Sequence, residues 1–222
     1  MAIIKGSARQ TTAVERVDEG AEVYLRMLRD GSMGVTDLIA LWSLEGRVFT
    51  SSLGAATTPV TFGAGTLDTT EFDLHVAIPS SVVIIPLEFT VNFDLYGTAL
   101  VVELALQYGT GSVTGSGTAD IPPSSNAIAG LSSACTVTWA AAAGTALTTV
   151  VNEFWHDGIQ LGSNVTTRTT LRSQTKFTYL AKDTGVLQVI GPSQQLVGWA
   201  SSNAGVGFGR FVYAELPKSA VA

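Results

Sequence analysis

The side chains of this 222-residue chain best suited to acid–base chemistry are its two histidines. The tetrapeptide Trp155-His156-Asp157-Gly158 sets an imidazole beside a carboxylate, although an Asp-Gly pair is typical of a turn. His75 alternates with apolar neighbours next to Asp73, so we expect it to face solvent from a strand. A nucleophilic serine needs a base nearby, and the sequence has no Gly-x-Ser-x-Gly motif. These residues therefore predict a protein that is not an enzyme.

Metal and cofactor motifs are also missing from the sequence. Two distant histidines are too few for the cavity of a cupin, and the single Cys135 excludes both an intramolecular disulfide and a cysteine-based zinc site. The segment Gly109–Gly115 resembles a dinucleotide-binding fingerprint, but Thr114 stands where the third glycine belongs. We therefore predict no catalytic residue, no metal site and no cofactor.

Charged residues are scarce. They make up 14% of the chain, with 12 Lys and Arg against 18 Asp and Glu, whereas an ordinary soluble domain has about 25%. The net charge of −6 argues against a dedicated nucleic-acid-binding module. Residues 121–152 carry no charge at all. This deficit predicts either a Ser/Thr-rich exterior or a surface that contacts other proteins.

One mildly basic segment lies near the N-terminus. Lys5, Arg9 and Arg16 precede the acidic pair Asp18-Glu19. We interpret residues 1–20 as an arm that contacts a neighbouring subunit or the interior of an assembly, with the frayed terminus as the alternative. Three cations neutralise little phosphate, so any contact of this arm with a genome is expected to be weak or indirect.

Alternating apolar and polar residues predict that strands position most side chains. Apolar residues occupy every second position from Leu87 to Leu95, and acidic or polar residues lie between them. The same pattern runs over 71–78, with His75 outward, and over 100–106. Further strands are expected at 136–140, 148–155, 176–180, 186–190, 195–199 and 208–216. Turn residues fill most of the gaps between them.

Helical patterns are few. Thr36 is expected to cap a short helix near residues 36–45 that Gly46 ends, while residues 14–28 fit either a helix or a strand around Tyr24. The strand pattern therefore predicts an all-β fold, a sandwich or a jelly roll, as a single domain over residues 21–222 with an N-terminal arm over 1–20.

No targeting or membrane-spanning segment is expected. Lys5 and Gly6 interrupt the apolar start of the chain, which indicates a cytoplasmic protein. The uncharged residues 121–152 are diluted by proline, glycine, serine and threonine, so they do not read as a membrane span.

Three segments together resemble a known family. They are Leu41–Phe49 (LWSLEGRVF), Thr58–Gly63 (TPVTFG) and Asp73–Leu87 (DLHVAIPSSVVIIPL), with a looser likeness in Phe211–Pro217. In this order they resemble jelly-roll capsid proteins of tailless or uncultured (environmental) viruses. The motifs describe how strands begin and turn, so they support a fold more firmly than an activity.

The resemblance implies that the fold is a single jelly-roll β-sandwich with an N-terminal arm and one short helix near residues 36–45. It also implies a structural virion protein, a capsid subunit that self-assembles through low-charge lateral surfaces into an icosahedral-type shell. Its partners would be copies of itself and other capsid proteins, and it would assemble in the host cytoplasm. Loops such as 109–125 and 191–194 are expected to make subunit contacts. The sequence does not indicate an internal membrane and leaves its presence open.

Two alternatives share the same fold. A carbohydrate-binding or adhesin module would stack sugars on exposed aromatic rings, for which Trp139, Trp155 and Trp199 are candidates, although each ring also suits the core. A glycan-active enzyme would need two acidic side chains converging in a groove.

Overall fold

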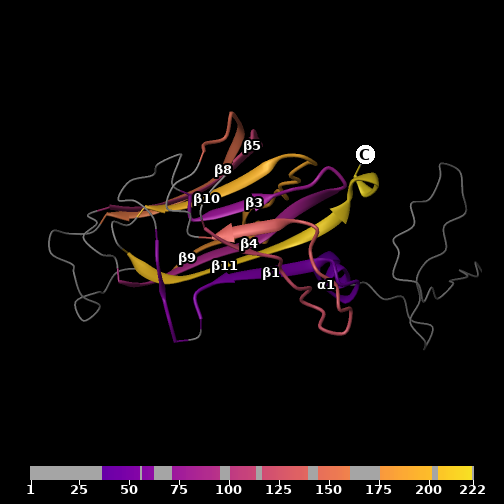
Figure 1. Ribbon diagram of the computed structural model, residues 1–222, viewed down its shortest axis with the longest axis horizontal. Coiled ribbons are helices and arrows are strands. Elements are labelled where there is room, and N and C mark those ends of the chain that lie inside the picture. Colours follow the sequence, from indigo (N-terminus) through magenta and orange to yellow (C-terminus); the bar gives the residue numbers. More distant parts are fainter. Residues whose placement is uncertain are drawn as a thin grey trace, which may run out of the picture.

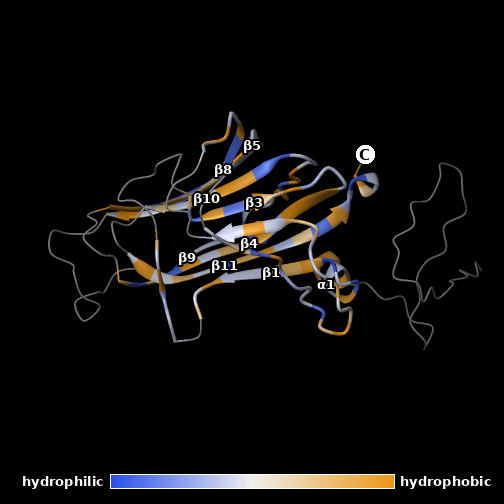
Figure 2. Cartoon of the chain, in the orientation of Figure 1, coloured by the Kyte–Doolittle hydropathy of each residue, from blue (hydrophilic) through white to orange (hydrophobic). Residues whose placement is uncertain are grey.

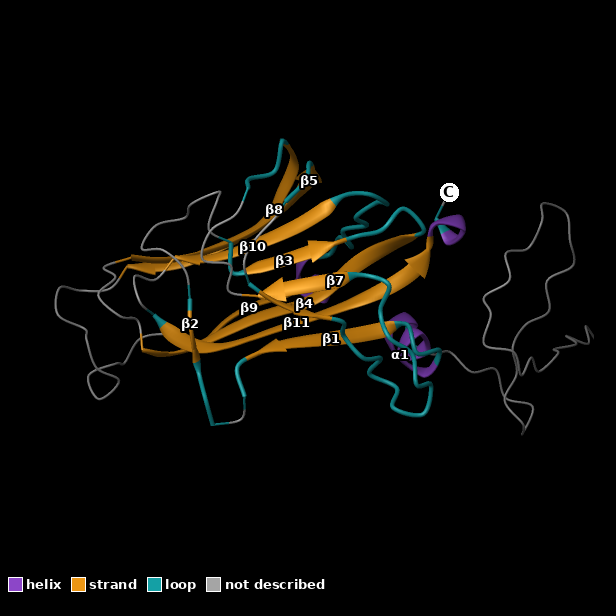
Figure 3. Cartoon of the chain, in the orientation of Figure 1, coloured by secondary structure: helices purple, strands orange, loops and turns teal. Residues whose placement is uncertain are grey.

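The structure is a computed structural model that describes residues 37–55, 57–62, 72–95, 101–113, 117–139, 145–160, 176–201 and 205–221. These residues form two antiparallel sheets stacked face to face, with little helix (Figure 1, Figure 3). The strands are β1 (Val48–Leu53), β2 (Val60–Thr61), β3 (Leu74–Ala77), β4 (Val82–Leu95), β5 (Val101–Thr110), β6 (Thr118–Asp120), β7 (Thr136–Trp139), β8 (Thr149–Gln160), β9 (Lys176–Leu180), β10 (Gln195–Ser201) and β11 (Val206–Pro217). The helices are α1 (Leu38–Leu44), α2 (Ala181–Thr184) and the 3₁₀ turn η2 (Lys218–Ala220).

The strand order is that of a jelly roll. One sheet has the order β1-β11-β4-β9, with β2 also paired to β11, and the other has the order β6-β7-β3-β10-β5-β8. Without β2, β6 and β7, each sheet has four strands, and the chain crosses between sheets at every step except from β5 to β8. This is the double Greek-key arrangement of a jelly roll, so the predicted fold class is confirmed. The β6–β7 pair is inserted into the β5–β8 connection and extends the second sheet beyond β3.

The central core lies between the two sheets, where apolar side chains from alternate strand positions meet. Phe89, Val91 and Phe93 of β4 face Leu104 and Leu106 of β5, and all are almost fully buried. Buried and less buried residues alternate along β7 and β9, whereas β3, β4 and β11 carry runs of buried residues, and Figure 2 shows long apolar stretches in the strands. Aromatic pairs add to this packing, at ring-centroid distances of 5.2 to 6.4 Å: Phe62–Phe93, Phe89–Trp139, Phe89–Trp155, Phe93–Phe177 and Phe211–Tyr213.

Leu87 and Leu95 do not share the face of Phe89, contrary to the sequence expectation. In the pairing with β11, Glu88 is opposite Val212 and Pro86 is opposite Tyr213, so Leu87 is the extra residue of a β-bulge. A bulge shifts the alternation by one residue, so Leu87 lies on the outer face. A second irregularity at Asp94 leaves Leu95 exposed.

Helix α1 covers the outer face of the five-stranded sheet at one end (Figure 3). Its Trp42 belongs to a second apolar cluster, together with Val48, Val83, Ile85, Leu87, Val212, Ala214 and Leu216. The expected helix near 36–45 is thereby confirmed, but Asp37 caps it rather than Thr36, because its carboxylate accepts a hydrogen bond from the Ile39 amide. Thr36 itself lies outside the described residues.

Gly46 ends α1 as expected. Its φ of +73° is left-handed, and its amide donates to the Ser43 carbonyl while the Arg47 amide donates to the Trp42 carbonyl. This is a Schellman motif, in which glycine avoids the strain of a side chain.

A third cluster covers the outer face of the six-stranded sheet and corrects the expectation for His75. Phe72, Ala105, Val113, Val197 and Trp199 form this cluster, and Leu147 packs against it. The segments 111–113 and 145–148 cross this face, held by a hydrogen bond from the Thr148 amide to the Thr110 carbonyl. His75 and Asp73 are therefore buried, not solvated.

Several strand boundaries differ from the sequence expectations. Residues 186–189 form no strand and only Ile190 pairs, with Ile84 of β4. The Asp157-Gly158 pair lies inside β8 and makes no turn, and the expected contact loop 109–125 contains β6. Strands β1, β2 and β6 were not expected, while residues 191–194 form a loop as predicted. The arm 1–20 and the ambiguous segment 14–28 lie outside the described residues. Within the described ranges no helix is both long and apolar enough to cross a membrane.

Candidate functional site

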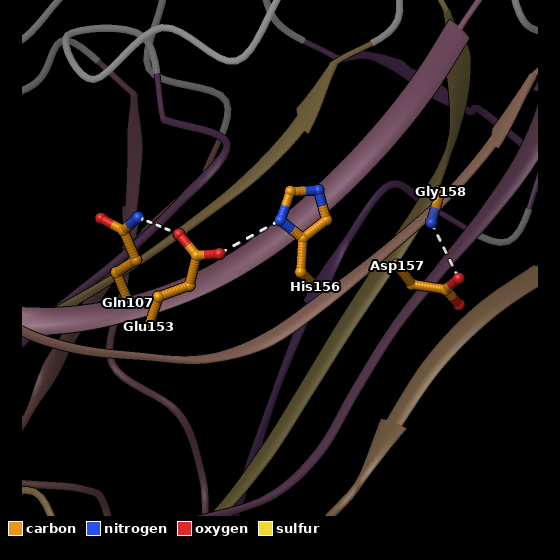
Figure 4. Close-up of polar contacts among 5 residues, drawn as sticks. All are labelled: Gln107, Glu153, His156, Asp157 and Gly158. Atoms are coloured by element: carbon orange, nitrogen blue, oxygen red, sulfur yellow. Dashed lines mark hydrogen bonds and ion pairs between the residues drawn. The ribbon is translucent and has the colours of Figure 1, made fainter.

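Strand β8 forms one edge of the six-stranded sheet and carries the histidine that the sequence singled out. His156 Nδ1 lies 3.1 Å from Glu153 Oε1, and the other Glu153 oxygen accepts a hydrogen bond from Gln107 Nε2 of β5 (Figure 4). Glu153 and His156 share a face although they are three residues apart, because Phe154 is the extra residue of a β-bulge between them.

The Glu153 carboxylate is stabilised in its charged form. The hydrogen bond from Gln107 is the main cause that lowers the pKa of Glu153, and the hydrogen bond and charge of His156 lower it further, against the opposing effect of burial. Both side chains of the ion pair are more than a third exposed, so water screens the interaction. The trio therefore gives the middle of β8 a solvated, charged edge.

Asp157 does not join this trio. Its carboxylate accepts a hydrogen bond from the Gly158 amide at 2.8 Å and points away from the imidazole (Figure 4). Successive side chains of a strand point to opposite faces, so adjacency in sequence separates His156 from Asp157 here. The imidazole–carboxylate contact exists, but with Glu153.

A buried polar network ties the inserted 121–135 segment to β11, and the sequence analysis did not single it out. Ser133 Oγ donates to Glu215 Oε2 at 2.6 Å and accepts from both the Tyr213 hydroxyl and the Cys135 amide. Burial raises the pKa of Tyr213, and it also raises the pKa of Cys135, to which the charge of Glu215 adds. Cys135 therefore stays a protonated, unreactive thiol.

One exposed apolar surface lies beside β1, where the 121–132 loop meets α1. We call Leu44, Ile128 and Leu131 the α1 patch; these side chains are 50 to 97% exposed. The loop is held by hydrogen bonds from Asn126 Nδ2 to the Leu44 carbonyl and from the Ser125 amide to the Val48 carbonyl. Between loop and helix is an open hollow of about 800 Å³, which these three side chains help to line.

A second exposed apolar surface lies at the start of β8. We call Val150, Val151, Val186, Leu187 and Val189 the β8 patch; these side chains are 41 to 61% exposed. The loop after α2 reaches β8 through Asn152 Nδ2, which lies 3.5 Å from Gln188 Oε1. The uncharged stretch 121–152, which predicts a contact surface, contains part of both patches. The apolar run at 186–190 instead predicts a strand, so the sequence did not indicate the rest of the β8 patch.

The candidate stacking residues lie in or against the apolar clusters. Trp139 is buried, with its indole Nε1 donating to Ser51 Oγ at 2.8 Å, and Trp199 is buried in the outer cluster with Phe72. Trp155 is partly buried and packs against the central core. Their positions lend no support to a stacking platform. Lys5, Arg9 and Arg16 lie outside the described residues, so the role of the arm stays a prediction.

No group of three or more His, Cys, Asp and Glu side chains in the described part of the chain is arranged to hold a metal ion. Comparison of the chain with protein-family models, curated proteins and solved structures finds no significant match. The fold is thus a two-sheet antiparallel β-sandwich with jelly-roll strand order. Its two exposed apolar patches are the candidate functional surfaces.

Proposed function

We propose that this chain is a structural virion protein, a capsid subunit that self-assembles through low-charge lateral surfaces into an icosahedral-type shell. The observation that carries the proposal is the pair of uncharged apolar patches on the edges of a jelly-roll sandwich. Exposed apolar patches on a protein otherwise well covered by polar groups mark sites of protein contact. Jelly rolls serve in viral shells, lectins and cupins, and large lateral contacts suit the first of these.

The histidines fit the cupin branch poorly. A cupin gathers histidines in the cavity between its sheets, whereas His75 and His156 both lie on the outer side of the six-stranded sheet. The tryptophan positions give the carbohydrate-binding alternative no added support either. Copies of the chain would assemble in a host cytoplasm and join with other capsid proteins. The N-terminal arm would supply at most a weak contact with the genome.

Sedimentation and negative-stain imaging of the purified full-length chain test the proposal. We expect regular closed particles or stable ring-shaped capsomers. A chain that stays monomeric across a wide concentration range and binds an oligosaccharide in a glycan screen would overturn the capsid function and favour the carbohydrate-binding alternative.

A further inference from the structure

The two apolar patches lie on opposite edges of the sandwich and at the same end of it. Ser125 of the 121–132 loop bonds to Val48 of β1, which is opposite Ala214 of β11, which in turn is opposite Ile85 of β4. On the far side of β4, Ile84 pairs with Ile190, next to the β8 patch. The segments that carry the patches are therefore at the same level and four strand spacings apart, about 19 Å.

The edges of the second sheet lie on the same two sides of the sandwich as the edges of the first. On one side, Ser51 of β1 donates to Asp120 of β6 at 2.7 Å, so β1 and β6 share an edge with the α1 patch. On the other side, Phe154 of β8 packs on Tyr179 of β9 at a centroid distance of 5.4 Å. At each patch the edges of both sheets lie together, and the two patches are on opposite edges of the sandwich.

The patches differ in construction. The α1 patch is formed by a helix end and a loop around a hollow, whereas the β8 patch is formed by the end of an edge strand and the loop after α2. A two-fold interface brings identical surfaces together, and it would cover only one of these two patches. A head-to-tail contact covers both of them in every copy.

The two loops that would meet in such a contact, residues 121–135 and 185–195, contain no charged side chain. Charged groups do line the hollow of the α1 patch, but each already has a partner within the chain: Arg47 is paired with Glu45, and Glu215 accepts hydrogen bonds from Ser133 and the Ala134 amide. The contact therefore leaves no unpaired charge away from water. The charged part of β8 begins only at Glu153, and the bulges at Val151 and Phe154 break the regularity of this free edge. Charges and bulges are features that discourage pairing of edge strands, which leaves the uncharged start of β8 as the part fit for contact.

We infer that the α1 patch of one copy binds the β8 patch of the next, so that copies of this chain join head to tail into a closed ring. The inference rests on the proposed function and names the lateral contact that the shell would use. A head-to-tail interface closes into a ring when its rotation divides a full turn, and otherwise grows into an open filament.

Disulfide trapping of the full-length chain tests this contact. Ile128→Cys and Leu187→Cys each place a thiol in one patch, while the only native cysteine is buried and protonated. Mixing the two single variants under mild oxidation should give a reducible dimer that neither variant forms alone. The double variant should give a ladder of covalent oligomers that stops at the size of the ring.

A matched control places the thiol at the far end of the sandwich. Leu95 is exposed to an extent similar to Leu187, and Leu95→Cys mixed with Ile128→Cys should give no dimer. Efficient self-crosslinking of Leu187→Cys alone would show a two-fold contact and overturn the inference, as would open filaments in the electron microscope.

The same material separates the inference from the proposed function. Closed particles without the Ile128–Leu187 crosslink would overturn the inference and leave the capsid function standing. Crosslinked rings that never close into shells would support the inference and overturn the shell. As a second readout, Ile128→Lys and Leu187→Asp should each abolish association, and mixing the two should restore it through one opposite-charge contact.

Discussion

At the scale of single residues, the polar side chains on the outer face of the six-stranded sheet occupy two different environments. His75 is only 6% exposed, its ring is tilted against that of Phe72, and its Nε2 lies 2.7 Å from Gln195 Oε1. An amide oxygen only accepts, so Nε2 carries the proton. His156, further along the same face, is open to solvent and pairs with Glu153. His75 lies beside Phe72 and Val197 of the third apolar cluster, whereas His156 lies on the edge strand β8.

His75 should make stability fall in mild acid. Burial lowers its pKa below 6.5, although the hydrogen bond with Gln195 acts in the other direction. Below pH about 6.5 the unfolded chain therefore binds a proton that the folded chain does not, and the free energy of unfolding decreases until the pH passes the folded pKa. Urea unfolding at pH 7.5 and 5.5 should show a smaller loss for His75→Gln than for the wild type.

His156→Gln provides the control for this experiment, because it removes the other histidine of the chain from a position that is exposed rather than buried. If His156→Gln removed the acid sensitivity and His75→Gln did not, the burial of His75 would not be its cause.

Ser133 is a buried polar residue on which several hydrogen bonds depend. Its hydroxyl contacts Tyr213, Glu215 and the amide of Cys135, all within 2.9 Å. Ser133→Ala leaves buried polar groups without partners, which should cost about 1 to 3 kcal/mol of unfolding free energy in urea denaturation. The neighbouring Ser132 is exposed, so Ser132→Ala should change stability by less than about 0.5 kcal/mol. Equal effects of the two substitutions would contradict this account of the network.

At the scale of elements, α1 and the 121–132 loop are built as one unit. Asp37 begins the helix and Gly46 ends it, and the loop then packs where a side chain at Gly46 would lie. A β-carbon at Gly46 would come within 2.8 Å of the Ala129 β-carbon. The glycine therefore serves both the helix end and the approach of the loop that carries Ile128.

A comparison of Gly46 with Gly130, which also has a positive φ, separates the backbone strain from the steric clash with the loop. Gly130 has a φ of +60° and no atom within 4 Å of the added carbon, so Gly130→Ala should cost only the backbone strain, about 1 kcal/mol. Gly46→Ala adds the clash with Ala129 and should cost about 2 to 3 kcal/mol in urea unfolding. A Gly46→Ala variant no less stable than Gly130→Ala would show that the loop yields freely at this point.

At the scale of the whole molecule, the low charge content is concentrated where copies would meet. Apolar residues on the outer faces of both sheets are buried in the clusters around Trp42 and around Trp199, whereas the uncharged segments 121–135 and 185–195 carry most of the two exposed patches. The apolar core between the sheets stabilises the fold, whereas the two patches are exposed and can contact other copies of the chain. The arm, with Lys5, Arg9 and Arg16, would add a second kind of contact between subunits.

Deletion of residues 1–20 tests the arm separately from the fold. Since the described sandwich begins at residue 37, the truncated chain should keep its strand-rich circular dichroism and its thermal midpoint. Particle yield, measured by sedimentation, should fall. An unchanged yield would refute the assembly role of the arm while leaving the lateral contact in place.

The alternation of apolar residues was enough to predict an all-β sandwich or jelly roll and most of the long strands, while the jelly-roll class itself was predicted from the family resemblance. A period of two determines which face of a strand is buried as long as pairing is regular, and Phe89, Val91 and Phe93 follow that rule. Turn chemistry likewise predicted the end of α1 at Gly46. The uncharged stretch 121–152 also pointed to Ile128, Leu131, Val150 and Val151 as candidate contact residues.

Only the tertiary structure decided what depends on residues far apart in the sequence. The bulge at Leu87 arises from pairing with β11, and His75 is buried beside Phe72 and Val197 of the outer apolar cluster. The partner of His156 is Glu153 because a bulge against β5 turns both to one face. The two apolar patches become opposite edges of one end only through strand order and register. Local sequence determines periodicity, but long-range pairing determines which surface each side chain finally shares.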